Sequence, residues 1–364
     1  MNNIKNANNN QERNKKDNEY YFELYNLKFF KTAKDNVEKL ELNRENVDFI
    51  ETALRIDSRY KNFANVNERP SIEYVAYLKR DREPSKKNDN KDENKRINLH
   101  KYGSSGYWIK QFIEIIKSNV KTNSNITKAT IKDDILQRET KNKDIQDTEL
   151  NLKTIIRGMV YAIDRENSTH LSANKDGNKV GRYNVSEKIY DYIEKKGIKT
   201  FIDNLVNEGN FGLIGYLAVP MDLEHENYHY SFATKFCKYV SNAFCKDVDE
   251  GNEKGKDNKE YKRDKYYVYD NVIIHNIEYY IQTEEYKIEE LRFNKKVYDK
   301  CKDDKEKEKA IEEHYKKFYN CLEKIREKAN EKIKKENKKI KNKKEIKEEI
   351  NRDEFDHLIW YSNK

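Results

Sequence analysis

The sequence predicts a mainly α-helical protein that ends in a long charged helix. Two observations carry this prediction. Apolar residues recur at spacings of three and four along several segments, which is typical of helices that bury one face. A Lys- and Glu-rich stretch near the C-terminus continues the same spacing over many turns. We therefore expect a bundle of helices in which the last long helix is highly charged.

Composition sets limits on the core and on the partners. The 364 residues suffice for one substantial core or two modest ones. With 38% charged residues and only 35% hydrophobic residues, much of the chain must be solvated helix surface or disorder rather than core. The net charge of +8 permits a nucleic-acid partner, although a genome rich in A and T would also produce a chain this rich in Lys and Asn.

Other sequence features bear on localisation and on metals. No run of about eighteen apolar residues is present, and the first residues contain no apolar signal segment. The four cysteines lack the close pairing of a zinc or iron–sulfur site, which favours free thiols in a reducing compartment. We expect a soluble, cytoplasmic protein with no membrane partner, no metal and no cofactor.

The N-terminal third is divided by polar segments. Residues 1–18 are predicted to be a disordered lead, and an N-terminal region follows at 19–99. Within this region we expect a helix near 44–56 and a segment at 71–78 whose pattern fits a strand or a helix. Charged residues and Pro84 make 80–98 a polar linker.

A helical core is predicted over residues 100–302. Apolar periodicity predicts core helices around 109–116 and 152–163. Ser186 is expected to start another helix that Gly197 ends, and Thr200 with Asp203 resembles a capping box that opens a segment ended by Gly209. Two further apolar stripes, at 232–243 and 273–281, predict helices separated by a flexible insert at 246–264.

The charged helix is predicted to cover residues 303–352. Its apolar seam consists of Ile311, Tyr315, Phe318, Leu322, Ile325 and Ala329. Such a seam packs on another helix, and it thins after Ile333. Residues 353–364 are expected to form a C-terminal anchor through Phe355, Leu358, Ile359 and Trp360.

Asp270 is the strongest candidate for chemistry. It follows the aromatic and β-branched residues Tyr267-Val268-Tyr269 and precedes an apolar helical stripe. An aspartate at a helix start is oriented by the backbone N–H groups that it caps. One of its oxygens is then able to face a substrate, whereas the alternative is an ordinary N-cap.

These segments resemble the helix-hairpin-helix DNA glycosylase superfamily over about residues 230–281. The residues that carry the resemblance are Ser231-Phe232-Ala233-Thr234-Lys235-Phe236 and Tyr267-Val268-Tyr269-Asp270-Asn271-Val272. The resemblance implies a glycosylase-like helical core, a DNA partner and a DNA-repair hydrolase. It also implies that Asp270 is catalytic and either stabilises the cationic sugar as a flipped base departs or orients the attacking water.

The same resemblance suggests further site residues. Tyr267, Tyr269 and Trp108 are expected to form a base pocket, with ordinary core packing as the alternative. The residues expected to contact DNA are Lys235, Lys238, Ser231, Gly212 and Gly215. The nearest match to the DNA-binding hairpin, Gly212-Leu213-Ile214-Gly215, is separated from the Ser231 helix. Ser231 stands where bifunctional members carry a lysine, so no lyase activity is expected.

Several alternatives remain open at the level of sequence. A non-enzymatic nucleic-acid- or protein-binding module would use residues 303–352 as its partner surface. The turn Gly103-Ser104-Ser105-Gly106 has backbone N–H groups for a phosphate but lacks the lysine of a P-loop. His225 and His229 would suit a metal if helical, although Pro220 favours a loop. A nuclease is also conceivable, but no carboxylate cluster for metal ions is evident.

Overall fold

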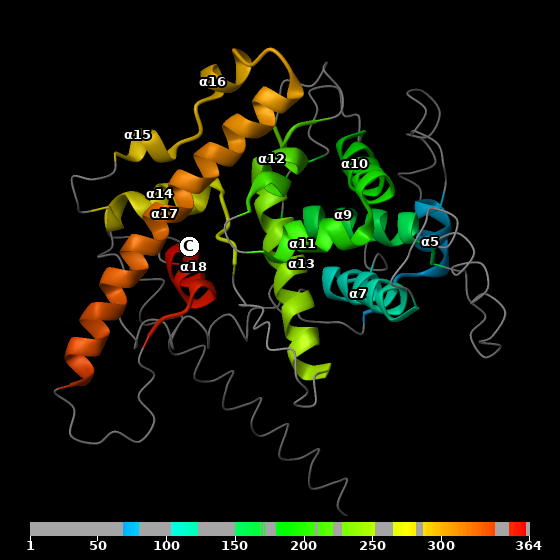
Figure 1. Ribbon diagram of the computed structural model, residues 1–364, viewed down its shortest axis with the longest axis horizontal. Helices are drawn as coiled ribbons and strands as arrows, with labels where there is room; N and C mark the ends of the chain where they lie inside the picture. The colour runs from blue at the N-terminus through cyan, green and yellow to red at the C-terminus, as the bar shows by residue number, and fades with distance from the viewer. Residues whose placement is uncertain are drawn as a thin grey trace, which may run out of the picture. The chain divides into compact units, whose positions relative to one another are not determined.

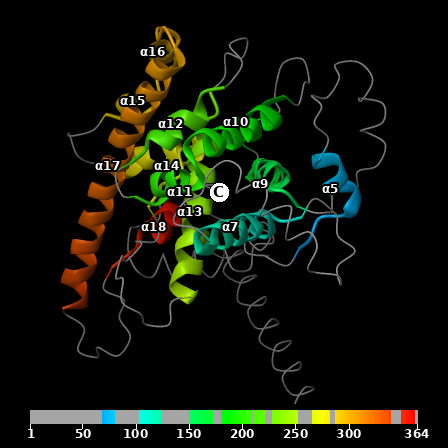
Figure 2. The same cartoon turned by 45° about the vertical axis from the view of Figure 1, so that its right-hand side comes forward.

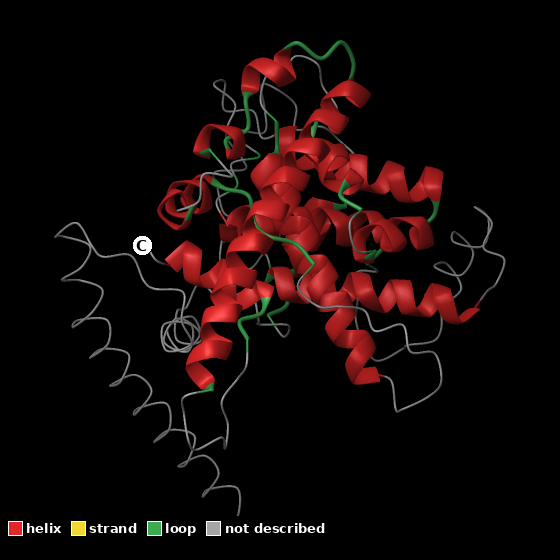
Figure 3. Ribbon diagram, turned by 60° about the vertical axis from the view of Figure 1, so that its left-hand side comes forward, coloured by secondary structure: helices red, strands yellow, loops and turns green. Residues whose placement is uncertain are grey.

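The computed structural model describes residues 68–79, 103–122, 150–167, 169, 171, 180–207, 210–220, 228–251, 265–281, 287–338 and 349–361. Every regular element within these residues is a helix, as Figure 3 shows. The predicted mainly α fold is therefore confirmed for this part of the chain. The expected disordered lead, the helix near 44–56 and the linker at 80–98 lie outside the described residues.

The chain forms two compact units, each built from segments that are distant in sequence. One, here called the core unit, contains residues 62–269 and 293–316. The other, called the C-terminal unit, contains the described residues within 270–292 and 317–364. Residues 270–292 group with the C-terminal segments, and the long charged helix is shared by both units.

The core unit is organised around one buried helix. Its helices are α5 (Ile72–Leu78), α7 (Ser105–Thr122), α9 (Leu152–Asn167), α10 (Val180–Lys196), α11 (Ile198–Val206), α12 (Gly212–Ala218), α13 (Tyr230–Gly251) and α16 (Lys295–Asp299). Helix α9 packs against α5, α7, α10 and α13, and it lies between α7 and α10 in Figures 1 and 2. Because α9 is covered on several sides, most of its residues are buried.

Gly158 allows α7 and α9 to approach closely. A Cβ atom at this position would lie 2.3 Å from the indole ring of Trp108, and Trp108 is fully buried. We expect Gly158→Ala to lower the free energy of unfolding by about 2 kcal/mol, because a close-packed core accommodates an extra methyl group poorly. Denaturant unfolding measures this loss.

Gly212→Ala provides the matched control for this substitution. A Cβ atom at Gly212 meets nothing nearer than 3.5 Å, so the change should be close to neutral. Equal stability of the two variants would contradict the close packing of Trp108 on Gly158.

Several predicted helix boundaries are wrong. Residues 72–78 form a helix, which resolves the ambiguity at 71–78. Helix α10 begins at Val180 rather than at Ser186, whose hydroxyl group donates to the carbonyl of Tyr183 within the helix. Helix α10 does end before Gly197, which has a φ of 86°. Helix α11 then starts at once, so Thr200 lies inside the helix and does not cap it.

The expected flexible insert at 246–264 is partly helical. Helix α13 continues to Gly251, and residues 252–264 lie outside the described part. Apolar periodicity ends near residue 245, so the sequence pattern contained no sign of these additional turns.

The C-terminal unit contains α14 (Asn271–Tyr280), α15 (Ile288–Leu291), most of α17 (Asp304–Asn337) and α18 (Arg352–Tyr361). Helix α14 packs on α18, and Asn276 Nδ2 donates to the carbonyl of Ile359 at 2.6 Å. Five of the six residues of the predicted α17 seam are buried, namely Ile311, Tyr315, Phe318, Leu322 and Ala329, whereas Ile325 is half-buried. Three of the expected anchor residues are also buried, namely Phe355, Leu358 and Ile359.

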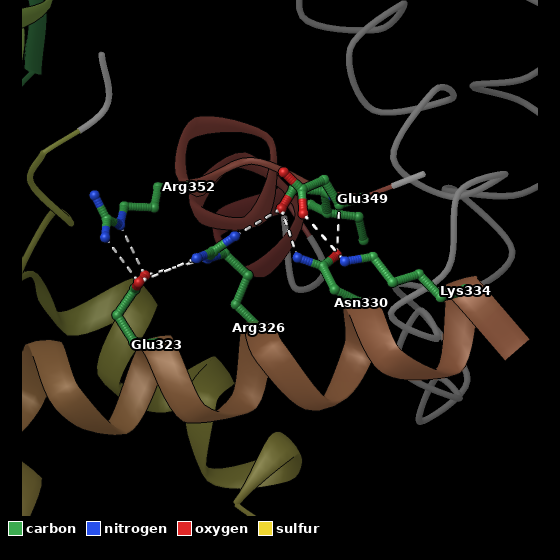
Figure 4. A network of polar contacts seen from close by, with 7 residues as sticks. Glu323, Arg326, Asn330, Lys334, Glu349 and Arg352 are labelled. Carbon is green, nitrogen blue, oxygen red and sulfur yellow. Dashed lines mark hydrogen bonds and ion pairs between the residues drawn. The ribbon is translucent and has the colours of Figure 1, made fainter. Parts of the chain in front are cut away.

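A polar network joins α17 to the segment that leads into α18 (Figure 4). The Glu323 carboxylate accepts hydrogen bonds from Arg326 and from Arg352, the latter at 2.9 Å. The Asn330 side chain accepts from the backbone N–H of Ile350 at 2.7 Å and donates to its carbonyl at 3.1 Å. One side of α17 is thus occupied by contacts within the chain.

Candidate active-site turn

The segment Lys265–Tyr269 between α13 and α14 has no regular secondary structure, and side chains form hydrogen bonds with the backbone of Tyr267 and Tyr269. The hydroxyl group of Tyr315 accepts from the backbone N–H of Tyr267 at 3.0 Å and donates to its carbonyl at 2.9 Å. The hydroxyl oxygen of Thr234 accepts from the backbone N–H of Tyr269 at 3.0 Å. Buried backbone groups need such partners, so Tyr315 and Thr234 determine the path of the chain immediately before Asp270.

The start of the segment is held by a buried lysine. Lys265 Nζ donates to the carbonyl of Leu205 at 3.1 Å and lies 3.1 Å from the hydroxyl group of Tyr266. The Tyr266 hydroxyl group also donates to the Leu205 carbonyl, at 2.8 Å. Because Leu205 belongs to the last turn of α11, the ammonium group also interacts favourably with the negative end of that helix.

Asp270 caps α14 as predicted. Its backbone is extended, with φ −147° and ψ 172°, and Oδ1 accepts from the backbone N–H of Ile273 at 2.9 Å. The side chain is half-buried. This hydrogen bond holds the carboxylate in one orientation at a defined point of the chain.

An aromatic cluster surrounds Tyr269, the residue before Asp270. The Tyr269 ring stacks on that of Tyr230, with centroids 4.1 Å apart, and its hydroxyl group accepts from the backbone N–H of Phe293 at 2.7 Å. Tyr230 hydrogen bonds with Nδ1 of His314 at 2.9 Å. Burial raises the pKa of Tyr230 well above its ordinary value, so this residue stays neutral and serves as a fixed aromatic support for Tyr269.

The three predicted base-pocket residues are not equally accessible. Trp108 and Tyr267 are fully buried, and Trp108 packs on Gly158 of α9. Tyr269 is half-buried. In this structure Trp108 and Tyr267 therefore have core positions, which leaves Tyr269 as the member of the set with exposed surface.

The predicted DNA-binding lysines of α13 lie inside the core unit. Lys235 Nζ approaches the carbonyl of Asn167, the last residue of α9, at 3.5 Å, and Lys238 is only 2% exposed. Tyr239 donates to the side chain of the same Asn167 at 3.0 Å. Ser231 is half-buried in the first turn of α13. Lys235 therefore interacts with the C-terminus of α9. This position differs from that of a surface lysine that contacts a phosphate.

The glycine segment expected to match the DNA-binding hairpin forms the start of α12. The backbone N–H of Gly212 donates to the side chain of Asn210 at 3.2 Å. Gly215 is buried, and a Cβ atom there would lie 2.3 Å from the carbonyl oxygen of Glu308. Gly215 thus permits close packing of α12 on the first part of α17.

The helix start after Gly103 is occupied by a carboxylate of the chain itself. Glu166, near the end of α9, accepts from the backbone N–H of Ser105 at 2.9 Å and from its hydroxyl group. Burial raises the pKa of Glu166 to about 7, although both hydrogen bonds from Ser105 act in the opposite direction. The N–H group proposed for a phosphate is therefore already used. Glu166 was not predicted, because its partner lies 61 positions away.

The described residues contain no group of three or more His, Cys, Asp or Glu residues arranged to hold a metal ion. Within the same part of the chain, no helix has the length and apolar character needed to cross a membrane. Comparison of the chain with protein-family models, with curated proteins and with solved structures found no match.

Proposed function

We propose that this protein binds DNA and hydrolyses the N-glycosidic bond of a flipped base, with Asp270 as the catalytic carboxylate. The observation that carries the proposal is the fixed cap geometry of Asp270 after a segment held by Thr234 and Tyr315. A preorganised charge stabilises a developing cation without reorganising during the reaction. This requirement distinguishes a catalytic carboxylate from one on a mobile loop.

The proposed reaction needs few groups. The bond between the sugar carbon C1′ and the base nitrogen breaks, and its electron pair leaves with the base, which takes a proton from solvent. The Asp270 carboxylate stabilises the cationic sugar and accepts a proton from the water whose oxygen bonds to C1′. By the resemblance to the glycosylase superfamily, Ser231 stands where the bifunctional members carry a lysine. The proposed product is therefore an intact strand with an abasic site.

Base release from DNA tests this function. Purified protein would be incubated with duplex and single-stranded oligonucleotides that carry alkylated, oxidised, deaminated or unmodified bases. Free base and alkali-sensitive abasic sites would then be quantified. We expect release of at least one base with no strand cleavage before alkali treatment. No release from the whole panel by folded protein would contradict the proposal.

A second candidate function is a binding module that acts through α17. Lys324, Lys328, Lys332 and Lys335 are exposed and follow one another at spacings of four and three, so they share a face of the helix. Replacing these four lysines with glutamine tests this function without removing Tyr315 from the candidate site. Loss of a steeply salt-dependent DNA affinity would favour this module, whereas loss of salt-insensitive protein binding would indicate a protein partner.

A further inference from the structure

A surface of the core unit combines aromatic and basic side chains. We call it the aromatic–basic surface and define it by Tyr228, Phe293, Lys295, Lys296 and Val297. The rings of Tyr228 and Phe293 meet edge to face with centroids 4.8 Å apart, and both residues are half-buried. Val297 is 52% exposed, one of two large hydrophobic side chains exposed among the described residues. The Phe293 ring also contacts those of Tyr298 and His314, so Tyr228 and Phe293 lie at the edge of the aromatic cluster and keep part of their surface exposed.

Lysines outnumber acidic residues in the segment that carries Phe293, and its one acidic residue, Asp299, lies close enough to Tyr228 to interact with it electrostatically. Four lysines, but only one acidic residue, occur from Phe293 to Lys302. The four, Lys295, Lys296, Lys300 and Lys302, are all exposed. The acidic residues that follow belong to the start of α17, where Asp303 accepts from the backbone N–H of Glu306 at 2.9 Å. Asp303 therefore caps α17, and the Glu306 carboxylate accepts from the backbone N–H of Lys302 at 2.8 Å.

The surface is connected directly to the candidate active-site turn. The backbone N–H of Phe293 donates to the Tyr269 hydroxyl group at 2.7 Å. The Phe293 ring packs against that of Tyr230, with ring centroids 5.5 Å apart. Tyr269 precedes Asp270 in the chain. One residue of the aromatic–basic surface, Phe293, is therefore hydrogen-bonded to Tyr269, the residue immediately before Asp270.

We propose that the aromatic–basic surface binds single-stranded DNA next to the turn. Tyr228 and Phe293 stack with a nucleobase, while Lys295 and Lys296 contact the adjacent phosphates. Combining aromatic rings with lysines is how proteins hold single strands without reading their sequence. The proposal rests on the DNA partner of the proposed function and does not require that the protein release a base.

Binding of a labelled single-stranded oligodeoxythymidine of about ten nucleotides, followed by fluorescence anisotropy, tests the proposal. We expect Tyr228→Leu and Phe293→Leu each to weaken binding at least about fivefold, the lower end of the effect of base stacking. The double variant Lys295→Ala/Lys296→Ala should reduce the dependence of log affinity on log salt by roughly 1.4, because each phosphate contact on a single strand contributes about 0.7.

The controls separate an effect of this surface from a loss of folding and from a general loss of positive charge. The two lysines are exposed, so their double variant should keep the melting temperature of the wild type. The double variant Lys196→Ala/Lys199→Ala, at exposed lysines of α10 and α11, should bind the oligonucleotide as the wild type does. No binding by the wild type at low salt would overturn the proposal even if duplex substrates release a base. Binding that is unchanged in the three surface variants would also overturn it, whereas binding without base release would support the surface and reject catalysis.

Discussion

Asp270→Asn is expected to lower the rate of base release by on the order of a thousandfold while leaving the fold intact. A preorganised charge or a general base commonly contributes 10²- to 10⁴-fold to catalysis. Asparagine removes the charge but keeps the oxygen that accepts from the backbone N–H of Ile273. Because asparagine and aspartate are similarly good N-caps, the free energy of unfolding should change by less than about 0.5 kcal/mol. Single-turnover base release and denaturant unfolding measure the two quantities.

Asp303→Asn is the matched control for this variant. Asp303 also accepts a backbone hydrogen bond at a helix start, from Glu306, but it is exposed at α17 and has no part in the proposed reaction. Its substitution should leave base release unchanged. If Asp270→Asn released base as fast as Asp303→Asn did, Asp270 would have only the structural role of a cap.

Glu166→Gln is expected to remove a large pH dependence of stability. The pKa of Glu166 is raised from 4.5 to about 7 in the folded protein, so the folded state binds a proton more tightly than the unfolded state does. The stabilisation by this proton is complete below pH 4.5 and is lost as the pH rises through 7. Its full size is about 3 kcal/mol, at about 1.4 kcal/mol for each pH unit between the two pKa values.

The difference between wild type and variant isolates this effect from other titrating groups. Glutamine stays neutral and is able to keep both contacts with Ser105, so Glu166→Gln should become more stable relative to the wild type as the pH rises from 5 to 8. The exposed Glu114 of α7 offers a control, because Glu114→Gln should show no such trend. A constant stability difference between Glu166→Gln and the wild type over this pH range would contradict a buried, proton-binding Glu166.

Local signals explain which elements were predictable. The apolar periodicity of α9 and of the α17 seam reflects burial of a continuous face, which leaves a mark on every turn of the sequence. The Asp270 cap was also visible, because the capping residue and the helix that it caps are adjacent. The prediction that Ser186 starts a helix was wrong, because a serine hydroxyl group inside a helix is also able to donate to a nearby carbonyl, here that of Tyr183. The sequence pattern does not separate this use of serine from a cap.

The sequence by itself therefore determined the helical class of the described residues, the helix end before Gly197 and the placement of Asp270 at a helix start. Only the tertiary structure decided that Trp108, Tyr267 and Lys238 are buried. It also brought Glu166 to Ser105 and Tyr315 to Tyr267, pairs that are 61 and 48 positions apart in the chain. Helix formation and capping depend on neighbours within a few residues. Burial and long-range hydrogen bonds depend on which helices pack together, and no local pattern encodes that choice.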